Sequence, residues 1–264
     1  MTGADSARLV RLVTDGGLAE IVLDRPEKLN AMSMAMVEQL MAALAAAERS
    51  PIRCLLVRGE GRAFCAGRDL SEADPGIEDG EAILRDVFHP LMRRMAAVAV
   101  PTFAAVQGAC LGTGLGLALA CDVVHVADDA RIGSPFARIG AVPDSGAHAA
   151  LVHRVGRHRA LELIYTGRML SGREAAALGL VNGSVPAAEL LEQTRKAARA
   201  AASGPTAAFR ESKRIVERLS GGAPTLDQVL DLEAEAQGRA SRTADYREGI
   251  AAFQEKREPR FQGR

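Results

Sequence analysis

The sequence predicts an α/β core followed by a helical extension, and three observations support this fold class. Apolar runs typical of buried strands alternate with segments of helical spacing over about the first 185 residues. Beyond that point only helical patterns remain. A chain of 264 residues, 48% of them hydrophobic, is also long enough to bury a substantial core. We therefore expect an α/β core over residues 1–200 and a helical region over residues 201–264.

The chain begins with a predicted β-hairpin and a helix. Residues 8–13 and 18–23 are apolar runs separated by the turn signal Asp15-Gly16-Gly17. Apolar residues then recur at helical spacing over residues 33–48, where Ser33 is a favourable N-cap residue. Further strands are expected over residues 52–57, 121–127 and 180–185, and loops over 59–70, 72–80 and 131–146. Helices are expected over residues 81–98, where Pro90 kinks or splits the helix, and over 147–165, 186–203, 205–219, 225–239 and 243–257.

Residues 101–122 are the stretch around which the rest is organised. They predict a buried strand, a glycine-rich turn and a helix that begins directly from the turn. The first N–H groups of a helix have no partner within it and can donate to an oxygen that gains negative charge. Alternatively, the glycines only allow close packing of helix on strand. The pattern by itself leaves both interpretations open.

Composition excludes several classes of function. The 33 basic and 33 acidic residues balance, so no overall field attracts nucleic acid or an anionic membrane. Aromatic residues make up 3% of the chain and tryptophan is absent, which argues against a base-stacking surface. The segment MTGADSARLV lacks the order of a signal peptide, and no apolar run is long enough to span a bilayer. We expect a cytoplasmic protein with neither nucleic acid nor membrane as a partner.

No metal or nucleotide site is expected. Cys54, Cys65, Cys110 and Cys121 lie in or beside apolar segments without metal-ligand spacing, which predicts small buried thiols. The glycine-rich turns at residues 65–68 and 111–114 match neither the dinucleotide-binding nor the phosphate-loop pattern. Two backbone N–H groups could still donate to one oxygen at such turns.

Two motifs stand out, GEGRAFCAGRDL at 59–70 and PTFAAVQGACLGTGLGLALACDVV at 101–124. Together with further segments in the same order along nearly the whole chain, they resemble the crotonase superfamily, the enoyl-CoA hydratases and isomerases. The resemblance implies a crotonase-like spiral of ββα units with a C-terminal helical trimerisation region. It implies a homotrimer or dimer of trimers that acts on an acyl-CoA thioester and needs no cofactor beyond the coenzyme A of its substrate. The backbone N–H groups of Arg68 and Thr113 would form an oxyanion hole for the thioester carbonyl.

The sequence departs from the hydratases of this family at two positions. Their two catalytic glutamates fall on Gly116 and Phe136 here. Without two carboxylates to position water and move its protons, ordinary hydration of an enoyl thioester is doubtful. This departure favours an isomerase over a hydratase.

Asp144 is the remaining candidate acid/base. An Asp after proline is commonly a turn residue. In the superfamily, however, dienoyl-CoA isomerases and the ring-epoxide isomerase of phenylacetate degradation have an acid at this place, and the latter resembles this chain through VPDSG at 142–146 and through residues 241–264. The resemblance therefore implies that Asp144 catalyses a proton shift in an unsaturated or ring-containing acyl-CoA.

Three other functions stay open. His89 falls where the chlorobenzoyl-CoA dehalogenases have a catalytic base, so His89 with Asp144 could support hydrolysis through an acyl-aryl intermediate. A hydratase could use displaced acid/base residues. A relative without catalysis could simply bind acyl-CoA.

Substrate and coenzyme A contacts are also implied by the resemblance. Arg25 and Lys28 lie in a loop where relatives contact the nucleotide, and Lys256 lies on the last helix, which can cover a neighbouring subunit's site. Each could equally be a solvated surface charge. The remaining substrate contacts are expected at and near the two turns, at Ala66, Gly67, Asp69, Leu70, Gly112 and Phe136.

Overall fold

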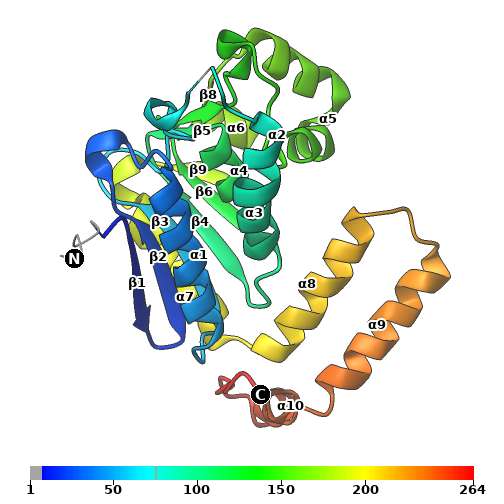
Figure 1. Ribbon diagram of the computed structural model, residues 1–264. Coiled ribbons are helices and arrows are strands. Elements are labelled where there is room, and N and C mark those ends of the chain that lie inside the picture. Colours follow the sequence, from blue (N-terminus) through cyan, green and yellow to red (C-terminus); the bar gives the residue numbers. More distant parts are fainter. Residues whose placement is uncertain (1–7, 75) are drawn as a thin grey trace.

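The computed structural model describes residues 8–74 and 76–264, so the prediction for the N-terminal segment lies largely outside the described residues. Its nine described strands form two sheets (Figure 1). The larger has the order β1-β2-β3-β4-β6-β9, in which β1 runs antiparallel to β2 and the others are parallel. Its strands are β1 (Val10–Asp15), β2 (Leu18–Leu23), β3 (Cys54–Gly59), β4 (Thr102–Val106), β6 (Val123–Ala127) and β9 (Gly183–Val185).

A smaller sheet stands beside the first and carries part of the site described below. It has the order β5-β7-β8, with β5 parallel to β7 and β7 antiparallel to β8. Its strands are β5 (Ala109–Leu111), β7 (Arg131–Gly133) and β8 (Leu170–Ser171).

Helices cover both faces of the larger sheet. The helices are α1 (Met34–Glu48), α2 (Gly80–Ile83), α3 (His89–Ala96), α4 (Thr113–Leu119), α5 (Ala147–Thr166), α6 (Gly172–Ala177), α7 (Ala187–Ser203), α8 (Thr206–Ser220), α9 (Leu226–Ala240) and α10 (Ala244–Glu255). In Figure 1, α1 lies in front of the strands and α7 behind them. All six residues of β2 are consequently buried, as is typical of a strand covered on both faces.

The predicted hairpin is confirmed, and so is the helix that Ser33 caps through the Met36 N–H. The region 101–122 was predicted with a single strand, and this was wrong. The chain leaves the larger sheet after β4, turns at Gly108 with a φ of +54°, and enters the smaller sheet as β5. A side chain at Gly108 would collide with the Arg62 carbonyl, so glycine is required where the two sheets meet.

Other differences concern short or irregular elements. The strands β7 and β8 were missed because they are only three and two residues long and lie among prolines and glycines. The helix predicted over 81–98 is α2, a π-helical turn over Leu84–Phe88 and α3, which places Pro90 in the first turn of α3 where its missing N–H costs nothing. The strand predicted over 52–57 lies at 54–59, and the last strand begins only at residue 183.

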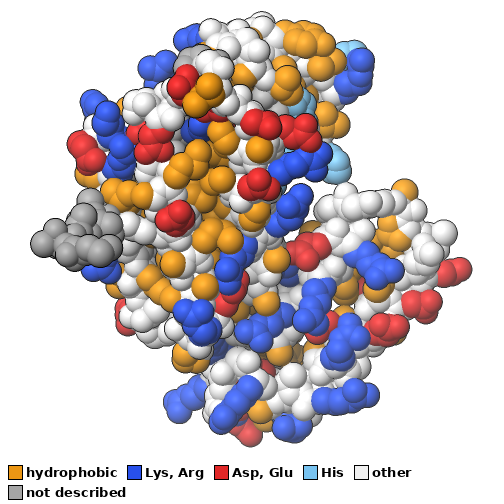
Figure 2. Space-filling view, in the orientation of Figure 1, with side chains coloured by type: hydrophobic (Ala, Val, Ile, Leu, Met, Phe, Trp, Pro, Cys, Tyr) orange, Lys and Arg blue, Asp and Glu red, His pale blue; other side chains and the backbone are white. Residues whose placement is uncertain are grey.

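The helices α8, α9 and α10 form a C-terminal arm that extends away from the core (Figure 1). The boundary predicted after residue 200 falls inside α7, which ends at Ser203. Figure 2 shows hydrophobic side chains on this arm among charged ones. Phe253 is 84% exposed and Leu226 is 71% exposed. Large exposed apolar residues of this kind mark a surface suited to contact with another chain.

Arg53 fastens the arm to the core. Its guanidinium donates to the carbonyl oxygens of Gly204 (2.5 Å) and Phe261 (3.1 Å) and to the Thr206 hydroxyl (3.0 Å). The buried Asp245 in turn accepts from the N–H groups of Gln262 and Gly263 at 2.6 and 2.7 Å. Arg53, which lies directly before β3, therefore holds both the beginning of the arm and the end of the chain.

We expect Arg53→Met to loosen the arm without unfolding the core. Hydrogen bonds from a charged donor contribute about 1.5–3 kcal/mol, so the loss of all three should destabilise the arm by about 2 kcal/mol. Hydrogen exchange of the amides of α8–α10 measures this directly. Arg49→Met, at an exposed position just after α1, is the matched control. Equal protection of the arm in both variants would contradict this role of Arg53.

Candidate active site

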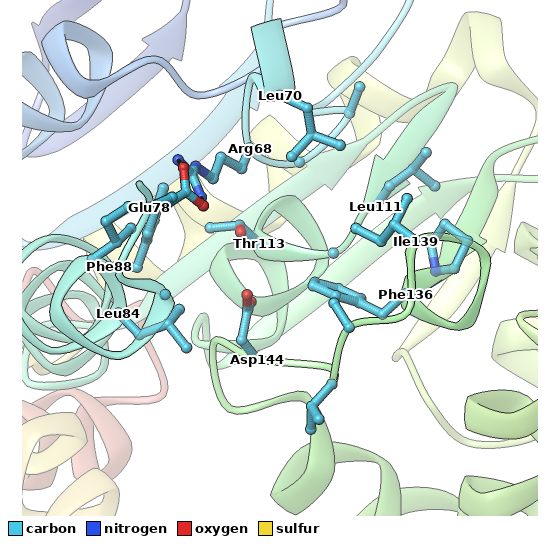
Figure 3. Close-up of a pocket in the computed structure, with 18 residues that line it drawn as sticks. Arg68, Leu70, Glu78, Leu84, Phe88, Leu111, Thr113, Phe136, Ile139 and Asp144 are labelled. Atoms are coloured by element: carbon cyan, nitrogen blue, oxygen red, sulfur yellow. Dashed lines mark hydrogen bonds and ion pairs between the residues drawn. The ribbon is translucent and has the colours of Figure 1, made fainter. Parts of the chain in front are cut away.

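A cavity of about 400 Å³ opens where the two glycine-rich turns meet (Figure 3). Its wall is largely apolar, with polar side chains at four places. The polar ones are Arg68, Glu78, Thr113 and Asp144; the others that line it are Ala66, Gly67, Leu70, Gly80, Ile83, Leu84, Phe88, Leu111, Gly112, Pro135, Phe136, Ile139, Ala141 and Val142. An apolar cavity with a few convergent polar groups is the usual form of a small-molecule site.

The two turns are held together by their backbones. The Leu111 N–H donates to the Cys65 carbonyl and the Cys65 N–H donates to the Ala109 carbonyl, each at 3.0 Å. A Cβ at Gly114 would lie only 2.5 Å from the Cys65 carbonyl oxygen. Glycine is therefore needed at this place for the turns to approach so closely, which supports the packing interpretation of Gly114.

The same geometry leaves two amides free. Met32 pairs with the residues on either side of Arg68, through Met32 N to Gly67 O at 2.8 Å and Asp69 N to Met32 O at 3.0 Å. Thr113 is the first residue of α4, so its N–H has no acceptor within the helix. Within the described part of the chain, neither the Arg68 amide nor the Thr113 amide has a hydrogen-bond acceptor. Both residues line the cavity, as an oxyanion hole requires.

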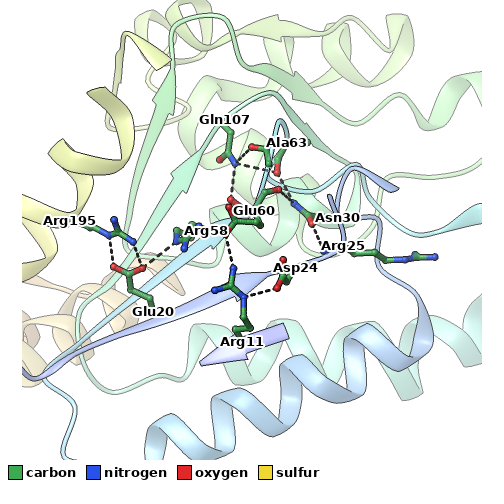
Figure 4. A network of polar contacts seen from close by, with 12 residues as sticks. Arg11, Glu20, Asp24, Arg25, Asn30, Arg58, Glu60, Ala63, Gln107 and Arg195 are labelled. Carbon is green, nitrogen blue, oxygen red and sulfur yellow. Dashed lines mark hydrogen bonds and ion pairs between the residues drawn. The ribbon is translucent and has the colours of Figure 1, made fainter. Parts of the chain in front are cut away.

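A buried polar network fixes the loop that leads to the first turn (Figure 4). The fully buried Asn30 side chain donates to the carbonyls of Glu60 and Ala63 at 2.9 and 2.8 Å. Gln107 donates to the Gly59 carbonyl at 2.8 Å. A chain of ion pairs connects β1, β2 and β3 with α7. It runs from Arg195 through Glu20, Arg58 and Glu60 to Arg11 and Asp24. The Arg68 amide thus follows a loop whose backbone carbonyls are bound by the Asn30 and Gln107 side chains.

Asp144 faces the cavity from the loop before α5 (Figure 3). The Ser145 hydroxyl donates to its carboxylate at 2.7 Å. Burial raises the pKa of Asp144 above the usual range of a carboxyl group, while hydrogen bonding from Ser145 and the charges of His89 and Arg68 act in the opposite direction. A carboxylate with a raised pKa is a better proton acceptor than one exposed to water.

Neighbouring residues pack closely around Gly116 and Phe136, the two positions where the hydratases have glutamate. A Cβ at Gly116 would lie 2.5 Å from both Cβ and the carbonyl oxygen of Ser145, so the loop that carries Asp144 rests directly on α4. The Phe136 ring covers Gly112, with 3.1 Å between Cε2 and a Cβ built there. The space of the first glutamate is therefore filled by the residue next to Asp144.

Arg68 contributes a side chain as well as an amide. Its guanidinium binds the Glu78 carboxylate through both terminal nitrogens, each at 2.6 Å. Arg68 Nε is buried without a hydrogen-bond partner among the described residues. Glu78 comes from the acidic loop before α2, so this ion pair joins that loop to the first turn.

Most predicted site residues come together here. Asp144, Arg68, Thr113, Ala66, Gly67, Leu70, Gly112 and Phe136 all line the cavity. Arg25 and Asp69 do not; they bind each other at 2.6 Å beneath the first turn, and Asp69 also accepts from the Ser71 N–H and hydroxyl. Because its guanidinium binds the buried Asp69, Arg25 supports the first turn. Lys28, His89 and Lys256 are also outside the cavity wall, and Lys256 is the C-cap residue directly after α10 on the arm.

The sequence indicates that residues 71–98 decide which acyl group is accepted, but it identified no individual residue of the cavity wall there. Glu78, Ile83, Leu84 and Phe88 lie in a stretch predicted as a surface loop and an ordinary helix. The apolar spacing of residues 83, 84 and 88 was the available signal, because it predicts that one face of the helix is buried. Their role in the cavity could not follow from it, since the π-helical turn that directs them is a feature of packing.

Two further findings concern what the described residues do not contain. Residues 8–74 and 76–264 include no cluster of His, Cys, Asp or Glu that could hold a metal ion. Over the same ranges, no helix combines the length and apolar character needed to cross a membrane. All four cysteines are free and buried, as predicted.

Comparison with known proteins gives a consistent result. The family described as "Enoyl-CoA hydratase/isomerase" matches residues 14–264. A Rhodobacter capsulatus protein named "Probable enoyl-CoA hydratase" is 40% identical over 98% of this chain and 100% of its own. The 1,2-epoxyphenylacetyl-CoA isomerase of Escherichia coli is 38% identical over 94% of this chain and 96% of its own. The crystal structure of an enoyl-CoA hydratase from Bacillus anthracis matches with a TM-score of 0.89 at 31% identity, over 97% of this chain and 100% of that one.

Proposed function

The chain belongs to the enoyl-CoA hydratase/isomerase family, and we propose that it isomerises a C=C bond or an unsaturated ring in an acyl-CoA thioester. Its fold is the crotonase fold that the sequence predicts. Asp144 is the acid/base of the proposed reaction, and the amides of Arg68 and Thr113 bind the thioester oxygen. The coenzyme A arrives with the substrate, and the reaction needs no other cofactor.

The proposed reaction moves one proton and adds no water. The thioester carbonyl accepts hydrogen bonds from the two free amides. Asp144 removes a proton from the carbon next to the thioester carbonyl, or next to a double bond conjugated with it, and the electron pair of that C–H bond moves to give an enolate or dienolate. The two N–H groups stabilise the negative oxygen. Protonated Asp144 then returns the proton to another carbon, so the double bond has moved and the carboxylate is regenerated.

The observation that carries this proposal is the presence of one unpaired carboxylate at the cavity. Of the two carboxylates that line it, Glu78 is bound to Arg68, whereas Asp144 has no salt bridge within the described part of the chain. Gly116 and Phe136 provide no second carboxylate. A single acid/base suits a proton shift, while hydration needs groups that position and deprotonate water.

Enolisation can be tested before the substrate is identified. We expect the protein to exchange a C–H proton of 3-enoyl-, dienoyl- or ring-type acyl-CoA into heavy water, followed by NMR. Because burial raises the pKa of Asp144, and because only its carboxylate form accepts a proton, the rate should fall as pH decreases through that raised pKa, at a higher pH than for an exposed Asp. Absence of exchange with every such thioester would refute the proposed function.

A hydratase is the main alternative, because several relatives bear that name. Water addition to crotonyl-CoA at a rate comparable with isomerisation would favour it. Hydrolysis with Asp144 as the nucleophile and His89 as the base is a further alternative. Incorporation of labelled oxygen from water into Asp144 during a single turnover would establish that reaction. Binding of CoA thioesters without any proton exchange would indicate a binder.

We also propose that the chain assembles as a homotrimer or a dimer of trimers and acts in the cytoplasm. The exposed apolar residues of the C-terminal arm support association through α8–α10. Coenzyme A contacts at Lys28 and, from a neighbouring subunit, at Lys256 belong to the same proposal.

A further inference from the structure

We propose that Glu78 is a positioning residue: by holding the Arg68 guanidinium, it keeps that cation from pairing with Asp144, so that the Asp144 carboxylate stays free to take a proton. This inference rests on the proposed function. It concerns the side chains of Arg68 and Glu78, to which neither the family resemblance nor the two oxyanion amides assign a role. Arg68 thereby acts twice, through its amide on the substrate oxygen and through its side chain on the acid/base.

The geometry places the three groups at one cavity. Arg68, Glu78 and Asp144 all line it, and Figure 3 shows the Arg68 and Glu78 side chains together on one side with Asp144 across from them. The bidentate contact between Arg68 and Glu78 leaves their side chains 17% and 22% exposed. A fork of two parallel hydrogen bonds fixes the guanidinium in one orientation.

Arg68 has hydrogen-bonding capacity beyond this pair. Its Nε is buried and has no acceptor in the described part of the chain. A buried, unsatisfied donor on a cation favours any rearrangement that supplies an acceptor. With Glu78 neutralised, Asp144 carries the remaining carboxylate among the described residues that line the cavity.

The charges around Asp144 show why this matters. His89 at the start of α3 and Arg68 on the first turn both act on Asp144 in the direction of a lower pKa, and the hydroxyls of Ser145 and Thr113 act in the same direction. Glu78 offsets the Arg68 charge, and Glu72 acts on Arg68 in the same direction with a smaller effect. Removing the Glu78 charge leaves the Arg68 cation less opposed, which lowers the pKa of Asp144 and makes it a weaker base.

The test is Glu78→Gln, which keeps the shape of the side chain and removes its charge. The acid limb of kcat against pH should move to lower pH by about one unit, the lower end of the effect of an opposite charge next to a carboxyl. The plateau kcat should fall about tenfold, since a weaker and partly engaged base transfers the proton more slowly. The KM should change less than kcat, because the two oxyanion amides remain.

A second substitution separates positioning from simple loss of the loop contact. Arg68→Met with Glu78→Gln keeps the Arg68 backbone amide and removes the competing cation, so it should restore most of the lost kcat and return the acid limb to its wild-type position. Glu81→Gln is the matched control, because Glu81 forms an exposed ion pair with Arg85 in the same region and does not line the cavity. It should leave both kcat and the pH profile unchanged.

Each outcome is decisive. If wild-type protein exchanges substrate protons but Glu78→Gln has the wild-type pH profile, the inference is wrong and the proposed function stands. If the double variant is no more active than Glu78→Gln, Glu78 only holds the loop and the inference is also wrong. If wild-type protein exchanges no proton, the proposed function itself fails. Circular dichroism of Glu78→Gln should match that of the wild type, since Glu78 lies in an exposed loop outside the regular elements.

Discussion

The Asp144→Asn variant is expected to lose about a thousandfold in kcat, within the range that a positioned acid/base contributes. Asparagine keeps the size of the side chain, and its amide oxygen can still accept from the Ser145 hydroxyl. It cannot take up a proton. The amides of Arg68 and Thr113 are unaltered. The affinity for an acyl-CoA should therefore remain within about threefold of the wild type, because the contacts that bind substrate and transition state equally do not involve the base.

Two measurements make this prediction specific. Exchange of substrate C–H protons into heavy water should fall together with isomerisation, because both require the same proton abstraction. Asp129→Asn, at an exposed turn before β7, is the matched control and should retain full activity. Unchanged turnover in Asp144→Asn on an active substrate would remove Asp144 from the mechanism.

The second large effect is expected at Gly116, which touches no reacting atom. A Cβ at this position would lie 2.5 Å from Ser145, so Gly116→Ala must push the loop that carries Asp144 away from α4. Displacement of a catalytic group by about 1 Å can cost about a hundredfold in rate, and we expect a loss of that size in kcat. Overpacking should also destabilise the fold by about 1–3 kcal/mol. Turnover must therefore be measured well below the unfolding temperature, which thermal denaturation defines.

Gly238→Ala is the matched control for this substitution. Gly238 also lies in a helix, α9, but a Cβ there meets nothing within 4 Å. The change should leave kcat unaltered and stabilise the helix by roughly 0.5–1 kcal/mol, since alanine is the better helix former. If Gly116→Ala retained wild-type kcat, the contact between α4 and Ser145 would not position Asp144.

The same contact predicts that Gly116→Glu will not recreate a hydratase. The space that a glutamate would need is occupied by Ser145. A second carboxylate could enter only if the Asp144 loop moved. The contact between Gly116 of α4 and Ser145 of the loop before α5 thus has two effects. It leaves no space for a glutamate at position 116, and it supports the loop that carries Asp144.

The sequence by itself determined the hairpin, the Ser33-capped helix, the two glycine-rich turns and the arm of helices, because each follows from apolar spacing, caps or turn residues close together in the chain. It also placed Arg68, Thr113 and Asp144 in one site, through motifs that resemble a known family. The family and the crotonase fold were confirmed by relatives that span the chain. The choice of isomerase over hydratase stays a proposal.

Only the tertiary structure decided how these residues act on one another. The approach of Gly116 to Ser145 joins residues 29 positions apart, and the separation of β4 from β5 into two sheets depends on the fit of Gly108 against Arg62. The pairing of Arg68 with Glu78 depends on where the acidic loop folds back over the cavity. No local pattern encodes such contacts, because they arise from the packing of segments whose relative positions are set by the whole fold. Steric fit and charge pairing across these segments determine the surroundings of Asp144.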